Sequence, residues 1–186
     1  FYASIPAIVG DFPEPFLHGY GGKIPKTIIV YEDGFEGEAL QLKDKLTDFG
    51  VNEVSIKTMV NLSDNEKKHS NLVLMGTKDF QPVSELNMIY DKVGFYVYFR
   101  NGEMVMLDCE GKIREKFVSG GVIQATQNPW NPKGILASEN VVWMVSGLSE
   151  DDVDSVVNVL VKHYDEIRYF FAVVVVDGKV KGVPLC

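Results

Sequence analysis

Acidic side chains are the residues of this sequence that are best placed to do chemistry. Glu32 and Asp33 follow an apolar run at 27–31, and Glu36 and Glu38 lie just beyond them. In an open α/β sheet, ligands bind beyond the carboxyl ends of the strands, which is where these carboxylates would lie. Paired carboxylates there could bind a divalent cation or hydrolyse a glycosidic bond. The default interpretation of such a pattern is a solvated acidic loop.

A second apolar run would bring further residues to the same crevice. The run at 71–76 ends in glycine, and a hydroxyl, an ammonium and a carboxylate side chain follow it. The candidate ligand crevice therefore consists of Glu32, Asp33, Gly76, Thr77, Lys78 and Asp79.

Signals for other kinds of chemistry are missing. His18, His69 and His163 are isolated from one another, and the sequence has no GxSxG, GxGxxG or Walker motif. Without HxH, HxxxH or CxxC spacing, the sequence gives a poor basis for a zinc site. We therefore expect no catalytic residue, no cofactor and no metal.

Cys109 and Cys186 are the two cysteines. In a reducing compartment both would remain as free thiols, which is the default interpretation. The alternative is one disulfide that ties the last residue to the body of an exported domain, where a chain end would otherwise fray.

One triplet, Asn61-Leu62-Ser63, matches the acceptor sequence for N-linked glycosylation. It lies in a polar stretch, which favours an exposed loop, although such triplets also arise by chance. Asn61 is therefore a candidate glycosylation site.

Composition excludes several classes of protein. Hydrophobic residues make up 46% and charged residues 24% of the 186 residues, as in soluble globular domains. The net charge of −8 argues against a nucleic-acid partner. The longest apolar run, 169–176, is far shorter than the roughly 18 residues that a membrane helix needs. Because the first residue is Phe1, we expect a processed or cut chain whose export signal would lie outside it.

Segments with strand-like and helix-like periodicity alternate along the chain. We predict strands at 27–31, 51–57, 71–76, 141–146 and 170–176, helices at 35–49, 83–93 and 150–164, and a closing hairpin to 183. Three short strands at 95–99, 104–107 and 113–117, joined at Asn101-Gly102 and Gly111, predict an antiparallel meander. The segment 120–126 fits a short helix.

The sequence therefore predicts one three-layer α/β domain over residues 1–186. Its central sheet would be mostly parallel, with the antiparallel β-meander inserted after residue 94. Residues 1–26 contain Pro6, Pro13, Pro15 and Pro25, so we expect an extended arm packed on the domain.

The loop Asn128-Pro129-Trp130-Asn131-Pro132 is the most individual segment of the sequence. Each proline forces the asparagine before it out of helical geometry, and Trp130 is a large apolar anchor. We predict a rigid structural loop fixed to the core, and the alternative is that a carbohydrate stacks on Trp130.

This loop also carries a resemblance to a family. A strand ending in glycine at 71–76, a glycine-led segment running into the Asn-Pro-Trp-Asn-Pro loop at 121–132, and a strand and helix at 141–147 and 150–160 are similar to the outer-domain modules of archaeal surface-layer (S-layer) proteins. The resemblance covers about residues 71–160, and it departs from that pattern after Gly76 and after Gly147.

The resemblance implies a non-catalytic structural or interaction module at an archaeal cell surface. Its partners would be other surface-layer proteins or glycans, and its location would be extracellular. The alternative is a small-ligand or carbohydrate binding protein, or a hydrolase, that uses the acidic crevice and lies in the cytoplasm.

Overall fold

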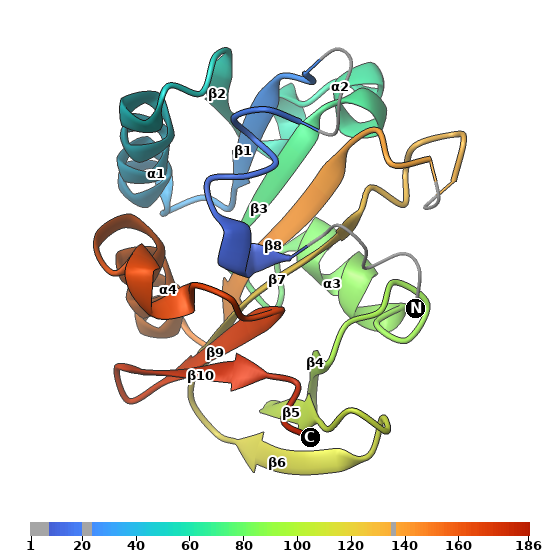
Figure 1. The fold of residues 1–186 in the computed structure, drawn as a ribbon, viewed down its shortest axis with the longest axis vertical. Helices are drawn as coiled ribbons and strands as arrows, with labels where there is room; N and C mark the ends of the chain where they lie inside the picture. The colour runs from blue at the N-terminus through green and yellow to red at the C-terminus, as the bar shows by residue number, and fades with distance from the viewer. Residues whose placement is uncertain (1–7, 20–23, 135–136) are drawn as a thin grey trace.

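Seven strands form the main sheet of the protein, whose computed structural model describes residues 8–19, 24–134 and 137–186 (Figure 1). In chain order they are β1 (Thr27–Tyr31), β2 (Val54–Lys57), β3 (Asn71–Thr77), β7 (Gly121–Gln127), β8 (Val141–Gly147), β9 (Ala172–Val176) and β10 (Lys179–Val183). Their order across the sheet is β10-β9-β7-β8-β3-β1-β2. The four strands from β8 to β2 run parallel, whereas β7 is antiparallel to β8 and β9, and β10 is antiparallel to β9. The sheet is therefore mixed rather than mostly parallel.

The short helix expected over 120–126 is wrong, because this segment forms β7 between β9 and β8. Every residue of β7 is buried, so the sequence lacks the apolar–polar alternation of a half-exposed strand. Gln124 and Thr126 are tolerated inside because their side chains donate hydrogen bonds to the carbonyls of Val97 and Val93, each at 2.9 Å.

The antiparallel meander predicted after residue 94 is confirmed. β4 (Val97–Arg100), β5 (Glu103–Leu107) and β6 (Ile113–Phe117) form a separate three-stranded sheet. The turn between β4 and β5 has φ angles of 53° at Asn101 and 74° at Gly102. Positive φ at both central residues is what a two-residue hairpin turn of type I′ requires, so the Asn-Gly pair specifies this connection.

Helices α1 (Glu36–Phe49) and α4 (Glu150–Lys162) lie on one side of the main sheet (Figure 1). Their buried side chains form one hydrophobic cluster with sheet residues such as Trp143. A second cluster joins other sheet residues to α3 (Gln81–Met88) and to β4 and β5. The helix that the sequence predicts at 83–93 corresponds to α3, which starts two residues earlier, at Gln81, and ends at Met88. Each cluster removes a large apolar area from water, which is the main favourable term for folding.

The described part of the predicted arm packs on the first cluster. Val9, in the 3₁₀ helix η2 (Val9–Asp11), is fully buried, and its backbone N–H donates to the carbonyl of Phe171 at 3.1 Å. The ring centroid of Phe16 lies 5.1 Å from that of Trp143. Residues 1–7 and 20–23 of the predicted arm lie outside the described residues.

Three buried asparagines, Asn128, Asn131 and Asn140, connect the 128–140 segment to the end of α2 (Asp64–His69), and we call them the asparagine clamp. The amide of Asn140 donates to the carbonyls of Lys68 and Ser70 at 3.0 and 2.7 Å. The amide of Asn128 donates to another carbonyl in the last turn of α2 at 2.9 Å. The amide of Asn131 donates to the side-chain oxygen of Asn140 at 2.9 Å. The clamp thus pairs carbonyls that the helix end leaves without intrahelical partners.

Trp130 lies against the clamp as a half-buried residue at the edge of the second cluster. Its backbone N–H donates to the side-chain oxygen of Asn128 at 2.8 Å, and the ammonium of Lys67 lies 4.5 Å from its ring centroid. The ring therefore packs on the end of α2, and its anchoring is shared with the asparagines on either side.

Replacing Asn140 by alanine should lower the free energy of unfolding by about 2–3 kcal/mol, because two carbonyls and the Asn131 amide lose a partner in a buried place. Asn158→Ala, on the exposed face of α4, is the matched control and should change stability by less than about 0.5 kcal/mol. Urea denaturation of both variants measures the difference. Equal stability of the two variants would show that the clamp contributes nothing.

Candidate functional site

A cavity of about 430 Å³ opens at the carboxyl ends of the parallel strands. β2 and β3 lie on opposite sides of β1, and the chain leaves β1 through α1 toward β2. The carboxyl ends of β1 and β3 therefore meet at a topological switch point, where open α/β sheets bind their ligands. The cavity is lined by Tyr31, Glu32, Asp33, Thr58, Met59, Val60, Thr77, Phe80 and Glu150. We call it the carboxyl-end crevice.

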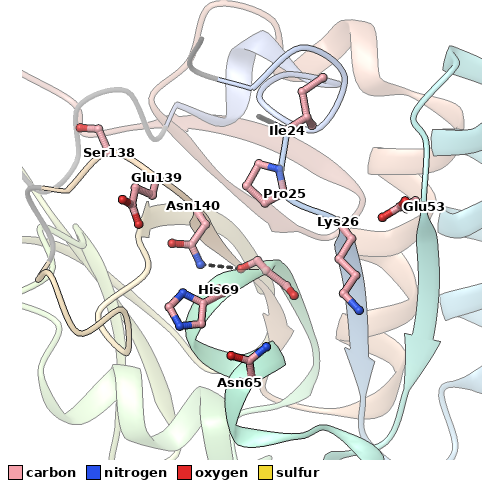
Figure 2. Close-up of a pocket in the computed structure, with 10 residues that line it drawn as sticks. Ile24, Pro25, Lys26, Glu53, Asn65, His69, Ser138, Glu139 and Asn140 are labelled. Carbon is pink, nitrogen blue, oxygen red and sulfur yellow. Dashed lines mark hydrogen bonds between the residues drawn. The ribbon is translucent and has the colours of Figure 1, made fainter. Parts of the chain in front are cut away.

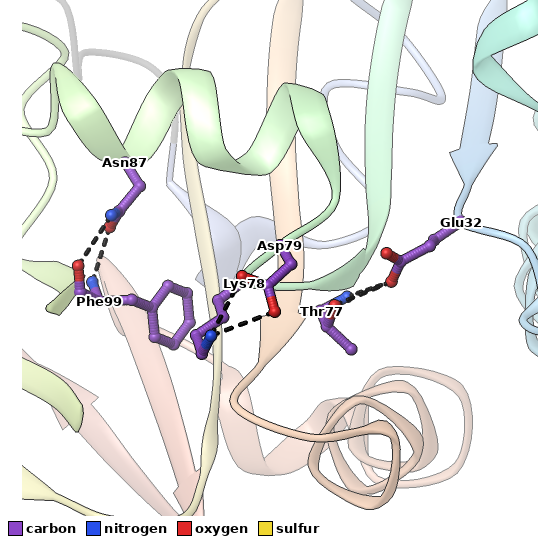
Figure 3. Close-up of polar contacts among 6 residues, drawn as sticks. All are labelled: Glu32, Thr77, Lys78, Asp79, Asn87 and Phe99. Atoms are coloured by element: carbon purple, nitrogen blue, oxygen red, sulfur yellow. Dashed lines mark hydrogen bonds and ion pairs between the residues drawn. The ribbon is translucent and has the colours of Figure 1, made fainter. Parts of the chain in front are cut away.

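Glu32 is fixed in this crevice by the strand beside it. One of its carboxylate oxygens accepts hydrogen bonds from the backbone N–H of Thr77 at 2.9 Å and from the Thr77 hydroxyl at 3.0 Å (Figure 3). These bonds join the end of β1 to the end of β3, so that oxygen holds the two strands together. No residue in the described part of the chain donates a hydrogen bond to the second oxygen of Glu32, so this oxygen can contact a ligand.

The six residues predicted for the crevice separate into two groups. Glu32, Asp33 and Thr77 line the cavity. Lys78 and Asp79 are not among the lining residues, and they pair with each other at 3.1 Å (Figure 3). Lys78 therefore brings no positive charge to the crevice.

Gly76 is the sixth predicted residue, and it is buried below the crevice. A Cβ atom at this position would lie 2.7 Å from Cδ2 of Phe80 and 2.8 Å from Cβ of Glu32. The absence of a side chain at Gly76 is therefore what lets Phe80 and Glu32 approach the end of β3.

Glu150 lines the crevice and was not predicted to do so. It opens α4, directly after β8, where its negative charge interacts favourably with the helix N-terminus. Thr58, Met59 and Val60 follow β2 in the same way. Glu150 and the three residues after β2 could have been predicted from their positions after predicted strands, because the carboxyl ends of parallel strands share one edge of the sheet.

Carboxylates and hydroxyls give this crevice its chemistry. Glu32, Asp33 and Glu150 contribute acids, and no lysine, arginine, histidine or cysteine is among the described lining residues. Such a set accepts hydrogen bonds and repels anions, so it suits a polyhydroxyl compound better than a phosphate. Glu36, one of the carboxylates that the sequence places after the first strand, and Asp79, predicted for the crevice, are not among the lining residues.

A second cavity, of about 550 Å³, lies at the opposite edge of the sheet (Figure 2). Lys26, Glu53, Ser70 and Asn140 line it, and each belongs to the segment that leads into a parallel strand. This site was not predicted from the sequence, although these residues lie at the amino ends of the predicted strands, which share one edge of a parallel sheet. The amide of Asn140 donates to the carbonyl of Ser70, the residue after α2 (Figure 2), so one member of the asparagine clamp lines this cavity.

The three histidines lie apart, as their isolation in the sequence implies. His18 lies in the arm beside Glu14, His69 lines the cavity at the amino ends, and His163 ends α4 with its ring 3.5 Å from Glu166. Among residues 8–19, 24–134 and 137–186, no group of three or more histidine, cysteine or acidic side chains is placed to hold a metal ion.

Two further predicted sites are on the surface. A disulfide joins Cys109 to Cys186, with the Cα atoms 5.2 Å apart, and it closes a separation of 77 residues. Asn61 is exposed at the end of the 3₁₀ helix η3 (Met59–Asn61), next to the carboxyl-end crevice. Within the described part of the chain, no helix is long and apolar enough to cross a membrane.

A groove between α1 and α4 holds two acidic side chains, Glu38 and Asp154. Partial burial and the neighbouring Glu38 carboxyl raise the pKa of Asp154 to about 6. Asp151 acts in the same direction, and Lys162 also lines the groove. The folded protein therefore binds a proton at Asp154 more tightly than the unfolded chain does.

The stability of the wild-type protein should rise as the pH falls from 7.5 to 5. Because the pKa of Asp154 is higher in the folded state than in the unfolded chain, protonation of Asp154 stabilises the folded state. This stabilisation is complete below the pKa of the unfolded chain and is lost as the pH rises through about 6. Asp154→Asn should remove this part of the pH dependence, and Asp44→Asn, at an exposed position of α1, is the control. Thermal unfolding at several pH values measures the slopes, and equal slopes for wild type and Asp154→Asn would contradict the assignment.

Gly76→Ala should lower the free energy of unfolding by about 1–3 kcal/mol, because the new methyl group overlaps Phe80 and Glu32. Gly37→Ala is the control, since a Cβ there meets nothing within 4 Å. Alanine in α1 at that position should raise stability by up to about 1 kcal/mol. Denaturant melts of both variants test this, and a neutral Gly76→Ala variant would mean that the end of β3 is loosely packed.

Comparison with known proteins adds no relative: no protein-family model matches the chain, and no curated protein resembles it significantly. The function must therefore be inferred from the residues and geometry described above.

Proposed function

We propose that this protein is a non-catalytic structural or interaction module of an exported protein at an archaeal cell surface, similar to an S-layer module. The Cys109–Cys186 disulfide is the observation that carries the proposal. Both cysteines are exposed, and a surface disulfide persists in an oxidising compartment but not among cytosolic thiols. Other surface-layer proteins or glycans would be its partners.

The disulfide also fits a mechanical role. Cys186 is the last residue described, and the bond fixes it to the turn between β5 and β6. The residue before Cys186 is also attached to this turn, since Leu185 forms a parallel β-bridge with Asp108. Leu185 and Cys186 are thus held against the small sheet and its β5–β6 turn at two places.

The use of the 128–132 loop supports the same proposal. The side-chain amide of Asn128 donates a hydrogen bond to the end of α2, and that of Asn131 donates to Asn140. Trp130 packs beside them. The segment that carries the resemblance to S-layer modules is therefore occupied in holding the fold together. We further infer a three-layer packing, with the main sheet between α1 and α4 on one face and α3 with the small sheet on the other.

A small-ligand or carbohydrate binding protein, or a hydrolase, is the second candidate. The carboxyl-end crevice favours it, because Asp33, Glu150 and the second oxygen of Glu32 face one cavity at the switch point of the sheet. A cytoplasmic protein with free thiols would support this candidate over the first.

Labelling of intact cells with a membrane-impermeant amine reagent tests the proposed location. Lys112 and Lys179 are exposed side chains on the surface of the protein, so at least one should carry the label before lysis. Cys109 and Cys186 should resist alkylation until a reductant is added. Labelling that occurs only after lysis, together with two alkylated thiols in unreduced protein, would refute a cell-surface module.

A further inference from the structure

The β2–α2 connection presents one asparagine whose amide has no role in the fold. Asn61 is exposed, and its side chain makes no hydrogen bond within the described residues. Its backbone is fixed, because its N–H donates to the carbonyl of Thr58 at 3.1 Å. Val60, beside it, is 93% exposed, so the solvent reaches this turn freely.

The two residues after Asn61 are held by the fold. Leu62 packs against the second hydrophobic cluster, and its backbone is extended, with φ −84° and ψ 119°. Ser63 is the N-cap of α2: its hydroxyl accepts a hydrogen bond from the N–H of Glu66, and its own N–H donates to the Glu66 carboxylate, both at 3.1 Å. The acceptor triplet therefore lies in a fixed turn in which the Asn61 side chain is exposed to solvent.

From this geometry we infer that Asn61 carries an N-linked glycan, an inference that rests on the proposed exported location. Asn61-Leu62-Ser63 is the only N-x-Ser/Thr triplet in the sequence. The amide nitrogen Nδ2 of Asn61 forms a bond to C1 of a sugar held on a polyprenyl-phosphate-linked donor. The bond from C1 to the phosphate oxygen breaks, the phosphate leaves with the electron pair, and Nδ2 loses one proton.

A glycan at this position would cover a definite part of the surface. Thr58, Met59 and Val60, the residues immediately before Asn61, form one rim of the carboxyl-end crevice. The sugar would therefore stand over that rim and shield the exposed side chain of Val60. A crevice covered in this way suits a structural module better than an enzyme that must admit a substrate.

Variants can separate the glycan from the helix cap. Asn61→Gln removes the acceptor and should leave the thermal midpoint of the unglycosylated protein unchanged, because the exposed Asn61 side chain makes no hydrogen bond with the part of the chain that the structure describes. Ser63→Ala removes both the triplet and the cap of α2, and it should lower that midpoint by about 2–4 °C. Ser63→Thr keeps both functions and should keep the glycan.

Mass spectrometry of the protein purified from its native cells tests the inference. Trypsin should release residues 58–67, a peptide that contains Asn61 and, as an internal control outside any triplet, Asn65. The sugar mass should be on Asn61, should be lost in Asn61→Gln and Ser63→Ala, and should remain in Ser63→Thr. Unmodified Asn61 in protein whose Cys109 and Cys186 are disulfide-bonded would overturn this inference alone. Unmodified Asn61 together with free thiols would overturn the proposed function as well.

Discussion

The start of the two central parallel strands depends on asparagine side chains. β3 and β8 are neighbours in the sheet. The segments that lead into them are a helix, α2, and the loop at 128–140, and these two segments do not pair as strands. Asn140 and Asn128 supply the missing connection by donating to carbonyls of α2 and Ser70, and Asn71 accepts the N–H of Val141 at 3.0 Å. Asn71, Asn128 and Asn140 are buried, so each of these side chains would cost free energy if it lost its partner. The register between β3 and β8, and with it the shape of both sheet edges, rests on this polar junction.

The register between β3 and β8 determines where the two cavities lie, the carboxyl-end crevice and the cavity at the amino ends of the strands. The carboxyl-end crevice forms where the residues after β1, β2, β3 and β8 converge, and Glu32 holds two of these ends together through Thr77. The cavity at the other edge has Asn140 in its wall. One acidic oxygen in the crevice is therefore structural before it is available to any ligand. This division of Glu32 between strand pairing and ligand contact weakens the case for a pair of free catalytic carboxylates there.

Turns and helix ends could be predicted from the sequence, because a few neighbouring residues determine them. The Asn101-Gly102 turn, the Ser149 cap and Gly50 at the end of α1 each fix a boundary through one or two backbone angles or hydrogen bonds. β7 could not be predicted in this way, because burial on both faces removes the alternation and its polar side chains find partners far along the chain. The crevice was half predicted for a related reason: Glu32 and Asp33 follow β1 directly and Thr77 ends β3, whereas the direction of Lys78 is decided by its pairing with Asp79.

An unusual segment of sequence need not be a binding site. The 128–132 loop stands out because two asparagines precede prolines, and each proline keeps its asparagine out of a helix, where the side chain could not reach another segment. In the turns that this loop forms, Asn128 bonds across 61 residues to Lys67, while Asn131 bonds to Asn140 nearby. Trp130 packs beside the junction, with the ammonium of Lys67 over its ring. The loop therefore joins α2 to the central strands of this fold, and an unusual sequence pattern of this kind is explained by architecture before it is explained by a ligand.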